Sequence, residues 1–277
     1  MRRINMKYLQ NLHTHSTYCD GKDTLEEMIA AAIEQGFQSV GFSGHSYMHY
    51  SPNHSMSLSG TEEYRKEIAL LKEKYKGKLD IFCGLEVDMY SEIDLSGYDY
   101  LFGTAHYLKK DGEYLGFDRG VSEVTELVDN HFGGDGMAFA KMFYETIAEL
   151  PGYGKFDVLA HYDICAKLVE KKQFFDENDP KYQKYAIEAL DALTGKIPFF
   201  EVNTGAIARG YRTTPYPASF LLKEFKDRGW GPVIGSDCHD KRFLKHHFDE
   251  TEAILKAAGF REIYVLKSTG FEAIPLD

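Results

Sequence analysis

Histidines and carboxylates recur along the chain where short apolar runs end. His13 and His15 stand in the segment NLHTH, and Asp237 and His239 stand in GSDCH. Residues two apart on a β-strand point to the same face of a sheet, so both members of each pair can reach one metal ion. Residues of the same types follow other apolar runs, or lie in the turn after the first one: Asp20, His45, Glu86, His106 and His161.

Together these nine side chains predict a site for divalent metal ions. A single histidine at a strand end is more often a structural residue than a ligand, so the prediction depends on the whole ordered series. One ion takes about four to six protein ligands. The six histidines and three carboxylates therefore suit two or three ions, with a carboxylate such as Glu86 bridging two of them. Donors of nitrogen and oxygen without thiolates are compatible with zinc, manganese or iron.

Strands and helices are expected to alternate between these residues. Short β-rich apolar runs bounded by turn residues predict strands at 8–13, 39–43, 81–87, 100–105, 158–161, 199–203, 233–236 and 263–266. Apolar residues at helical spacing predict helices at 24–36, 64–77, 136–149, 181–193, 217–228 and 249–258. The first helix begins with a capping box of Thr24 and Glu27, and Gly36 provides a left-handed stop.

Seven or eight β-α repeats in 277 residues predict an α/β fold, a parallel barrel of the TIM-barrel type. The carboxyl ends of all strands in such a barrel meet at one face, which would bring the nine side chains together. A doubly wound open sheet is the alternative. No linker divides the chain, so we expect a single domain over 1–277. Region 109–136, rich in glycine and aspartate and without a clear strand, is expected to be an excursion over the site.

The composition favours a cytoplasmic globular protein. The net charge of −11 disfavours a dedicated nucleic-acid binder, which would normally carry a basic face. No stretch approaches the roughly 18 apolar residues of a membrane span, and the start MRRINMKYLQ lacks the apolar core of a signal peptide. The four cysteines are scattered, which indicates free thiols in a reducing compartment. The oligomeric state is not predicted.

The ordered motifs resemble those of the polymerase and histidinol phosphatase (PHP) family over essentially the whole chain. They are HTH near the N-terminus, SGH, GLEVD, a histidine after the fourth and the fifth strand, and GSDCH. The segments LAHYDICAK and FFEVNTGAIARG are similar to those of the stand-alone histidinol-phosphatases of this family. The resemblance implies a distorted (β/α)7 barrel, and it nominates the same nine residues as ligands of a two- or three-metal centre. Asp20 departs from the family pattern, because many members have a histidine there.

A phosphomonoester also needs cationic side chains to hold its oxygens. Arg209, just past the sixth strand, is placed to donate to two phosphate oxygens, and the resemblance also points to this position. Lys167 lies where members of the family tend to carry a cation, and Arg212 is a weaker candidate. Asn203 is either a hydrogen-bond donor for substrate or a structural turn residue. The amine and imidazole of histidinol phosphate could meet acidic and aromatic residues: Glu113, Tyr114, Phe117, Asp118 and Asp163.

The function expected from these observations is metal-dependent hydrolysis of L-histidinol phosphate to L-histidinol and phosphate, in histidine biosynthesis. The ions would present hydroxide as the nucleophile, and Asp237, His239 and Arg209 would be the catalytic residues. The partner is then a small phosphorylated metabolite, with no nucleic acid and no membrane. Alternatives are a general phosphatase, a nucleotide phosphodiesterase or an amidohydrolase on the same cluster, or an exonuclease or polymerase-accessory domain. The five remaining histidines are expected mostly at the surface: His49, His54, His131, His246 and His247.

Overall fold

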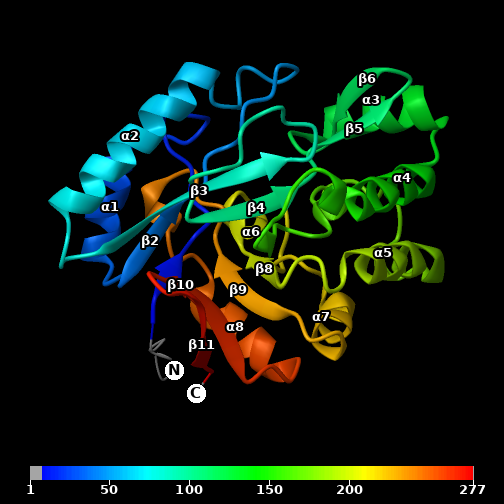
Figure 1. Ribbon diagram of the computed structural model, residues 1–277. Coiled ribbons are helices and arrows are strands. Elements are labelled where there is room, and N and C mark those ends of the chain that lie inside the picture. Colours follow the sequence, from blue (N-terminus) through cyan, green and yellow to red (C-terminus); the bar gives the residue numbers. More distant parts are fainter. Residues whose placement is uncertain (1–7, 277) are drawn as a thin grey trace.

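The computed structural model describes residues 8–276, and its centre is a sheet of seven parallel strands (Figure 1). In sheet order, the strands are β1 (Gln10–Asn11), β2 (Ser39–Phe42), β3 (Asp80–Asp88), β4 (Tyr100–Thr104), β7 (Val158–Leu159), β8 (Phe199–Asn203) and β9 (Gly231–Gly235). The first seven predicted strands are therefore confirmed, although β1 and β7 are shorter than expected. Residues 1–7 and residue 277 lie outside the described residues. Residues 1–7 are part of the N-terminal segment that is expected not to be a signal peptide.

The sheet curves until its first and last strands meet. Thr14, just beyond β1, forms a parallel bridge with Cys238, just beyond β9. The His15 N–H donates to the Cys238 carbonyl (2.9 Å), and the Cys238 N–H donates to the His13 carbonyl (3.0 Å). The fold is thus the predicted distorted barrel of seven strands and not an open doubly wound sheet.

Helices cover the outside of the barrel. They are α1 (Leu25–Glu34), α2 (Leu58–Lys74), α3 (Val121–Phe132), α4 (Gly136–Ala148), α5 (Pro180–Leu193), α6 (Gly205–Ala208), α7 (Ser219–Asp227) and α8 (Phe248–Ala257). Figure 1 shows α1 and α2 beside β2 and β3, with α4 and α5 on the opposite side of the molecule. Residues 89–99, between β3 and β4, contain no described helix, which is one departure from regular β-α alternation.

The first helix illustrates how local sequence places the barrel elements. The Thr24 hydroxyl accepts from the Glu27 N–H (3.2 Å) and the Glu27 carboxylate accepts from the Thr24 N–H (2.9 Å), so the predicted capping box is confirmed. Leu25 and Met28 on the inner face are buried. Gly36 has a φ of +82°, the left-handed conformation predicted for the helix stop. The strand that follows is thereby directed back into the sheet.

The expectation of an irregular region at 109–136 was wrong. β5 (Tyr107–Lys110) and β6 (Glu113–Gly116) form an antiparallel hairpin, and α3 follows. Asp111 and Gly112 at the hairpin tip have φ values of +52° and +86°, as a two-residue Asp-Gly turn requires. This turn was readable in the segment KKDGEY, but the mostly polar residues around it conceal the strand pattern.

The predicted strand at 263–266 is present as β10 (Glu262–Lys267) but lies outside the barrel sheet. It pairs antiparallel with β11 (Gly270–Pro275), which the sequence did not predict. The side chain of Gln10 connects this hairpin to β1, since it accepts from the Leu266 N–H (2.7 Å) and donates to the Leu266 carbonyl (2.8 Å). The hairpin therefore packs against the end of the barrel opposite the metal-ligand face.

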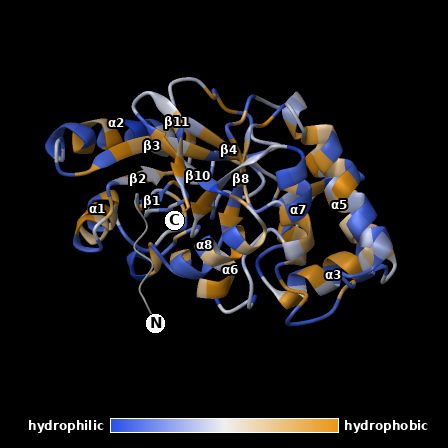
Figure 2. Ribbon diagram, turned by 90° about the horizontal axis from the view of Figure 1, so that it is seen from below, coloured by the Kyte–Doolittle hydropathy of each residue, from blue (hydrophilic) through white to orange (hydrophobic). Residues whose placement is uncertain are grey.

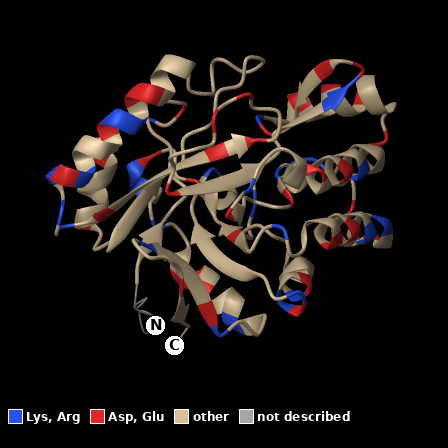
Figure 3. Ribbon diagram, viewed as in Figure 1, with Lys and Arg blue, Asp and Glu red and all other residues tan. Residues whose placement is uncertain are grey.

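Apolar residues face the core of the barrel fold, and charged residues lie along its outer helices. Figure 2 shows helices with one hydrophobic and one hydrophilic face, and Figure 3 shows Lys, Arg, Asp and Glu interspersed along the outer helices. The apolar faces bury a core that extends from α1 to α8. None of the helices within residues 8–276 combines the length and the apolarity of a membrane span.

Candidate metal centre

All nine predicted donors converge at the carboxyl ends of the barrel strands. Their nitrogen and oxygen atoms form four groups, and within each group the donor atoms lie within 4.8 Å of one another. The groups are His13, Glu86 and His161; His13, His15 and Asp237; His45, Glu86 and His106; and His15, Asp20, His45 and His239. Since the groups share several members, the arrangement is one continuous cluster with room for more than one ion.

The deep part of this cluster is built on β3 and on the residues just beyond β1 and β7, and it is closed to solvent. His13, Glu86 and His161 are each at most 1% exposed. Glu86, on β3, lies at the centre, with one carboxylate oxygen 2.8 Å from His161 Nε2 and the other 3.3 Å from His13 Nε2. It also approaches His45 Nδ1 (2.9 Å). A carboxylate surrounded by imidazoles from several strands has the placement that a bridging ligand requires.

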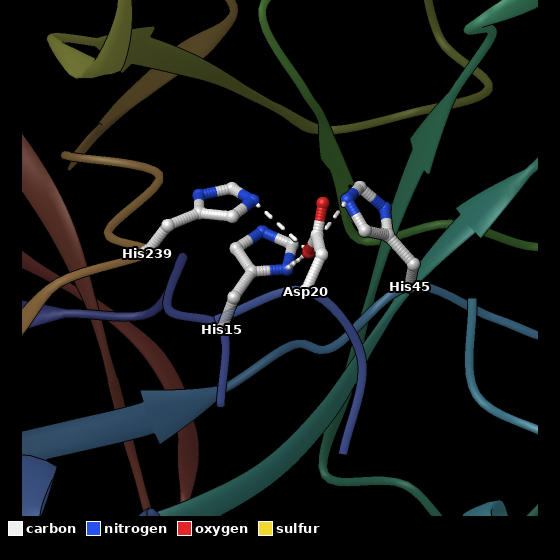
Figure 4. A group of neighbouring side chains, drawn as sticks. All are labelled: His15, Asp20, His45 and His239. Carbon is white, nitrogen blue, oxygen red and sulfur yellow. Dashed lines mark ion pairs between the residues drawn. The ribbon is translucent and has the colours of Figure 1, made fainter. Parts of the chain in front are cut away.

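The outer part of the cluster lies at the rim. Figure 4 shows the Asp20 carboxylate between the rings of His45 and His239, with His15 beside it. Asp20 Oδ1 is 3.2 Å from His239 Nε2, 3.6 Å from His45 Nε2 and 3.8 Å from His15 Nδ1. The side chains of Asp20 and His239 are 27% and 24% exposed, so this part of the cluster opens to solvent.

Asp237 connects the deep and the outer parts. Its Oδ1 lies 3.1 Å from His15 Nε2 and 3.6 Å from His13 Nε2. Its backbone has a φ of +46°, in the left-handed region that non-glycine residues seldom adopt. This conformation occurs directly after β9 and turns the carboxylate into the cluster. Strained backbone conformations of this kind often occur at functional sites.

Positive charge around the two central carboxylates keeps both of them ionised. Burial alone would favour the neutral acid form of Glu86, but His13, His45 and His106 overcome this and hold its pKa well below the usual range. Burial likewise opposes ionisation of Asp237, whereas Arg209 and His13 hold its pKa well below the usual range. Burial, together with His239 and His45, lowers the pKa of His15 to about 3, so its ring is neutral, the form that binds metal.

The residues present fit divalent ions. His13 Nε2, His15 Nε2, Asp20 Oδ1 and Glu86 Oε2 are buried and have no hydrogen-bond partner among the described residues. Buried polar atoms are nearly always paired, so four such atoms in one cluster indicate a missing partner. Two ligands that are each about 2.1 Å from one ion lie roughly 3.0–3.5 Å apart, close to the separations at the rim.

Two carboxylates that the sequence reasoning missed support the histidines from behind. Glu201 on β8 is fully buried and lies 2.8 Å from His13 Nδ1. Asp88 at the end of β3 accepts from the His106 backbone N–H (2.7 Å) and lies 3.5 Å from His106 Nδ1. Each was readable as an acidic residue inside an apolar strand, in FFEVN and GLEVD.

A cavity of 240 Å³ opens over the rim of the cluster, and two predicted phosphate-binding residues line it. Arg209 donates through Nη2 to Asp237 Oδ2 (2.7 Å), and its Nη1 lies 3.2 Å from His239 Nδ1. Its buried Nε has no hydrogen-bond partner among the described residues. Lys167 is 7% exposed and donates to Asp118 Oδ2 (3.1 Å).

The other predicted polar residues are engaged within the protein. Asn203 is fully buried, donates to Glu201 Oε2 (2.9 Å) and accepts from the Gly205 N–H (2.8 Å). Arg212 is buried and donates to Glu177 (3.0 Å). Asn203 thus positions the end of β8, while its contact with substrate stays a prediction.

Two residues of region 109–136 lie at the cavity. Its residues Asp118 and Arg119 line the cavity, together with His54 from the loop after β2. His54 Nδ1 lies 3.7 Å from Asp20 Oδ2, so this histidine belongs to the rim rather than to the surface at large. Neither Arg119 nor His54 was singled out in the sequence, because nothing local distinguishes them from solvated loop residues.

A family model and several known proteins are similar to this chain. The family model described as PHP domain matches residues 11–205. A probable histidinol-phosphatase of Deinococcus radiodurans is 28% identical over 272 residues, which cover 93% of this chain and 96% of the relative. The histidinol-phosphatase of Bacillus subtilis is 26% identical over 82% of this chain and 92% of its own length.

Solved structures show the same fold. The histidinol phosphate phosphatase of Lactococcus lactis, in complex with zinc, L-histidinol and phosphate, superposes with a TM-score of 0.73. It is 20% identical, and the match covers 97% of this chain and 100% of that one. A putative histidinol phosphatase from Listeria monocytogenes has a TM-score of 0.71 at 20% identity, over 87% of this chain and 99% of its own.

Proposed function

The chain belongs to the PHP domain family, and from this premise we propose that it is a metal-dependent phosphomonoesterase. Its substrate is L-histidinol phosphate, which it hydrolyses to L-histidinol and phosphate in histidine biosynthesis. The observation that carries the proposal is the cavity over the donor cluster, in which Arg209 and Lys167 share the lining with five of the nine donors: Asp20, His45, His106, Asp237 and His239. The names of the relatives, matched over nearly their full length, support the choice of substrate.

The nine donors would hold two or three divalent ions. Such ions supply a nucleophilic water at neutral pH and neutralise charge on the phosphoryl oxygens. Nitrogen and oxygen donors without a thiolate suit zinc, manganese or iron, and zinc is the first ion to test because it accompanies the Lactococcus lactis enzyme. We place the enzyme in the cytoplasm, in line with its four free cysteines.

Arg209 and Lys167 would bind the phosphate. The guanidinium lines the cavity and donates to Asp237 through Nη2, which holds its charge beside the cluster. Lys167 lines the same cavity, and Asp118 holds its ammonium at the site. Because phosphoryl transfer depends mainly on positioning and charge stabilisation, loss of either cation should weaken binding and slow turnover.

Asp118 would meet the ammonium group of the substrate. Among the carboxylates that line the cavity, it is the one outside the four donor groups. Lys167 holds its pKa below the usual range against the opposing effect of burial, so it is ionised at neutral pH. Asp118→Asn should therefore raise KM for histidinol phosphate more than it raises KM for 4-nitrophenyl phosphate, because both substrates lose the contact that holds Lys167 but only histidinol phosphate has an amine.

The experiment that tests the proposal is turnover of histidinol phosphate compared with other phosphomonoesters, a phosphodiester, an amide and single-stranded DNA. The protein is assayed as purified, after chelation, and after addition of zinc, manganese or iron. We expect kcat/KM to be highest for histidinol phosphate, and activity to vanish on chelation and return with metal. Full activity in metal-free protein, or preference for the amide or DNA, would contradict the proposal.

A substitution separates phosphate binding from metal binding. Arg209→Ala should raise KM for phosphomonoesters about 10- to 100-fold, because a charge-assisted contact worth roughly 1.5–3 kcal/mol is lost. The metal content should change much less than KM. Arg261→Ala, at an exposed arginine directly before β10, is the matched control and should leave both quantities unchanged. Unchanged kinetics in Arg209→Ala would remove this residue from the site.

A further inference from the structure

Glu201 is a buried carboxylate that contacts no Lys or Arg side chain among residues 8–276. It is fully buried in the middle of β8. Its only ion-pair partner within those residues is His13. Burying a carboxylate is costly, so such a group persists where its hydrogen bonds or its charge are needed.

Three donors from three different segments converge on this carboxylate. Oε1 lies 2.8 Å from His13 Nδ1. Oε2 accepts from the His161 backbone N–H (3.1 Å) and from the Asn203 amide (2.9 Å). An ionised carboxylate only accepts hydrogen bonds, so the proton between Glu201 and His13 resides on Nδ1.

The position of this proton decides which nitrogen of His13 is available. With Nδ1 protonated, the lone pair of the neutral ring is on Nε2. Nε2 is the atom that faces the cluster, 3.3 Å from Glu86 and 3.6 Å from Asp237, and it has no hydrogen-bond partner among the described residues. Stacking on Phe102, with ring centroids 4.7 Å apart, adds a second restraint on the orientation of the ring.

The neighbouring strand leaves room for this carboxylate. A Cβ atom at Gly235 on β9 would lie 2.0 Å from Glu201 Oε1, so a side chain at that position would displace the glutamate. Gly235 has no positive φ that would by itself require glycine. The glycine at this position is therefore explained by the space that Glu201 occupies.

We propose that Glu201 is a positioning residue that fixes the His13 tautomer and the His161 backbone, and thereby prepares the deep group of His13, Glu86 and His161 for one ion. The inference rests on the metal binding of the proposed function. One residue on β8 would thus orient two ligands that lie just beyond β1 and β7. A hydrogen bond to the far nitrogen of a ligating histidine typically changes metal affinity about 10- to 100-fold.

Glu201→Gln tests this proposal because the amide can satisfy only part of the arrangement. The His161 N–H and the Asn203 amide both need an acceptor, so the glutamine oxygen takes the place of Oε2. Its NH₂ group then faces His13 Nδ1 and donates to it. This favours the tautomer protonated at Nε2, which cannot bind metal through that atom.

The measurement is zinc affinity and stoichiometry, by titration against a competing chelator, with no substrate present. We expect the deepest, tightest ion to bind about 10- to 100-fold more weakly in Glu201→Gln, while the rim ion is nearly unaffected. The matched control is Glu252→Gln, a buried glutamate of α8 that pairs with Lys256. It should change stability without changing zinc affinity.

Two outcomes would overturn the proposal. One is a folded Glu201→Gln protein that binds every zinc ion with wild-type affinity. If that variant does not fold, a crystal structure of the zinc-loaded wild-type protein decides, because ligation of His13 through Nδ1 is incompatible with the contact to Glu201. A wild-type protein that binds no zinc, manganese or iron would contradict the proposed function itself, which keeps the two failures distinct.

Discussion

The metal cluster has two halves that differ in how the chain builds them. The deep half consists of residues that lie on a strand or within two residues of a strand end and are almost fully buried, with Glu201 bonded to the far nitrogen of His13. The outer half contains Asp20 and His239 from turns, with side chains 27% and 24% exposed. Asp20 Oδ1 has no hydrogen-bond partner among the described residues.

This difference indicates a division of labour within one cluster. Buried residues are held in place by many neighbours, so the deep half is organised before any ion arrives. Residues in turns keep more freedom, and the outer half borders the cavity that Arg209 and Lys167 line. The rim is therefore the part of the cluster where substrate can enter and where ions can exchange with solvent.

The largest effect is expected from Glu86→Gln, which affects both halves because Glu86 contacts His13 and His45 alike. The amide cannot bridge two ions, so we expect kcat/KM for histidinol phosphate to fall about 1000-fold. The metal content should fall by at least one ion. Glu92→Gln, at an exposed glutamate in the loop after β3, is the control. A Glu86→Gln enzyme with near wild-type activity would show that the cluster does not depend on its centre.

A smaller effect is expected from Asp20→Asn, which touches only the rim. An amide keeps an oxygen donor but loses the charge, so one ion should bind about 10-fold more weakly while the tight ion stays in place. The same titration as for Glu201→Gln gives both affinities. If Asp20→Asn weakened the tight ion as strongly as the loose one, the two halves would not be separable.

Chelation of the wild-type protein compares the deep and the outer half of the cluster without any substitution. We expect metal release in two phases, with the rim ion leaving first because its ligands are partly exposed and the deep ion leaving slowly because its ligands are buried. Metal analysis on samples withdrawn over time measures both phases. Release of all ions with a single rate constant would contradict the division.

The smallest effect is expected outside the cluster, from Thr24→Ala. The substitution removes the N-cap of α1, and we expect unfolding to require about 1 kcal/mol less. Urea unfolding measures this change. Because α1 supports the barrel and supplies no donor, zinc affinity should stay constant in both halves. A change in zinc affinity would show that the scaffold and the cluster are more tightly coupled than the contacts indicate.

Much of the site follows from the sequence, because strand-end position is a local property. Pairs such as His13 and His15 share a face by alternation, and turn residues mark where each strand ends. The capping box of Thr24 and Glu27 is equally local and is confirmed. The order of the strands then follows from β-α alternation. The hairpin at 107–116 was missed because apolar and polar residues do not alternate clearly along its strands.

Only the tertiary structure decides which donors share an ion and what holds them. His13 and Glu201 are 188 positions apart, and no local pattern connects a histidine just beyond β1 with a glutamate of β8. Their contact arises from barrel closure, which joins the segments just beyond β1 and β9, and from the glycine at position 235, which leaves room for Glu201. The sequence by itself therefore determined which residues can bind metal. Packing of distant strands decided how they are grouped, oriented and exposed, because these properties depend on contacts between residues far apart in the chain.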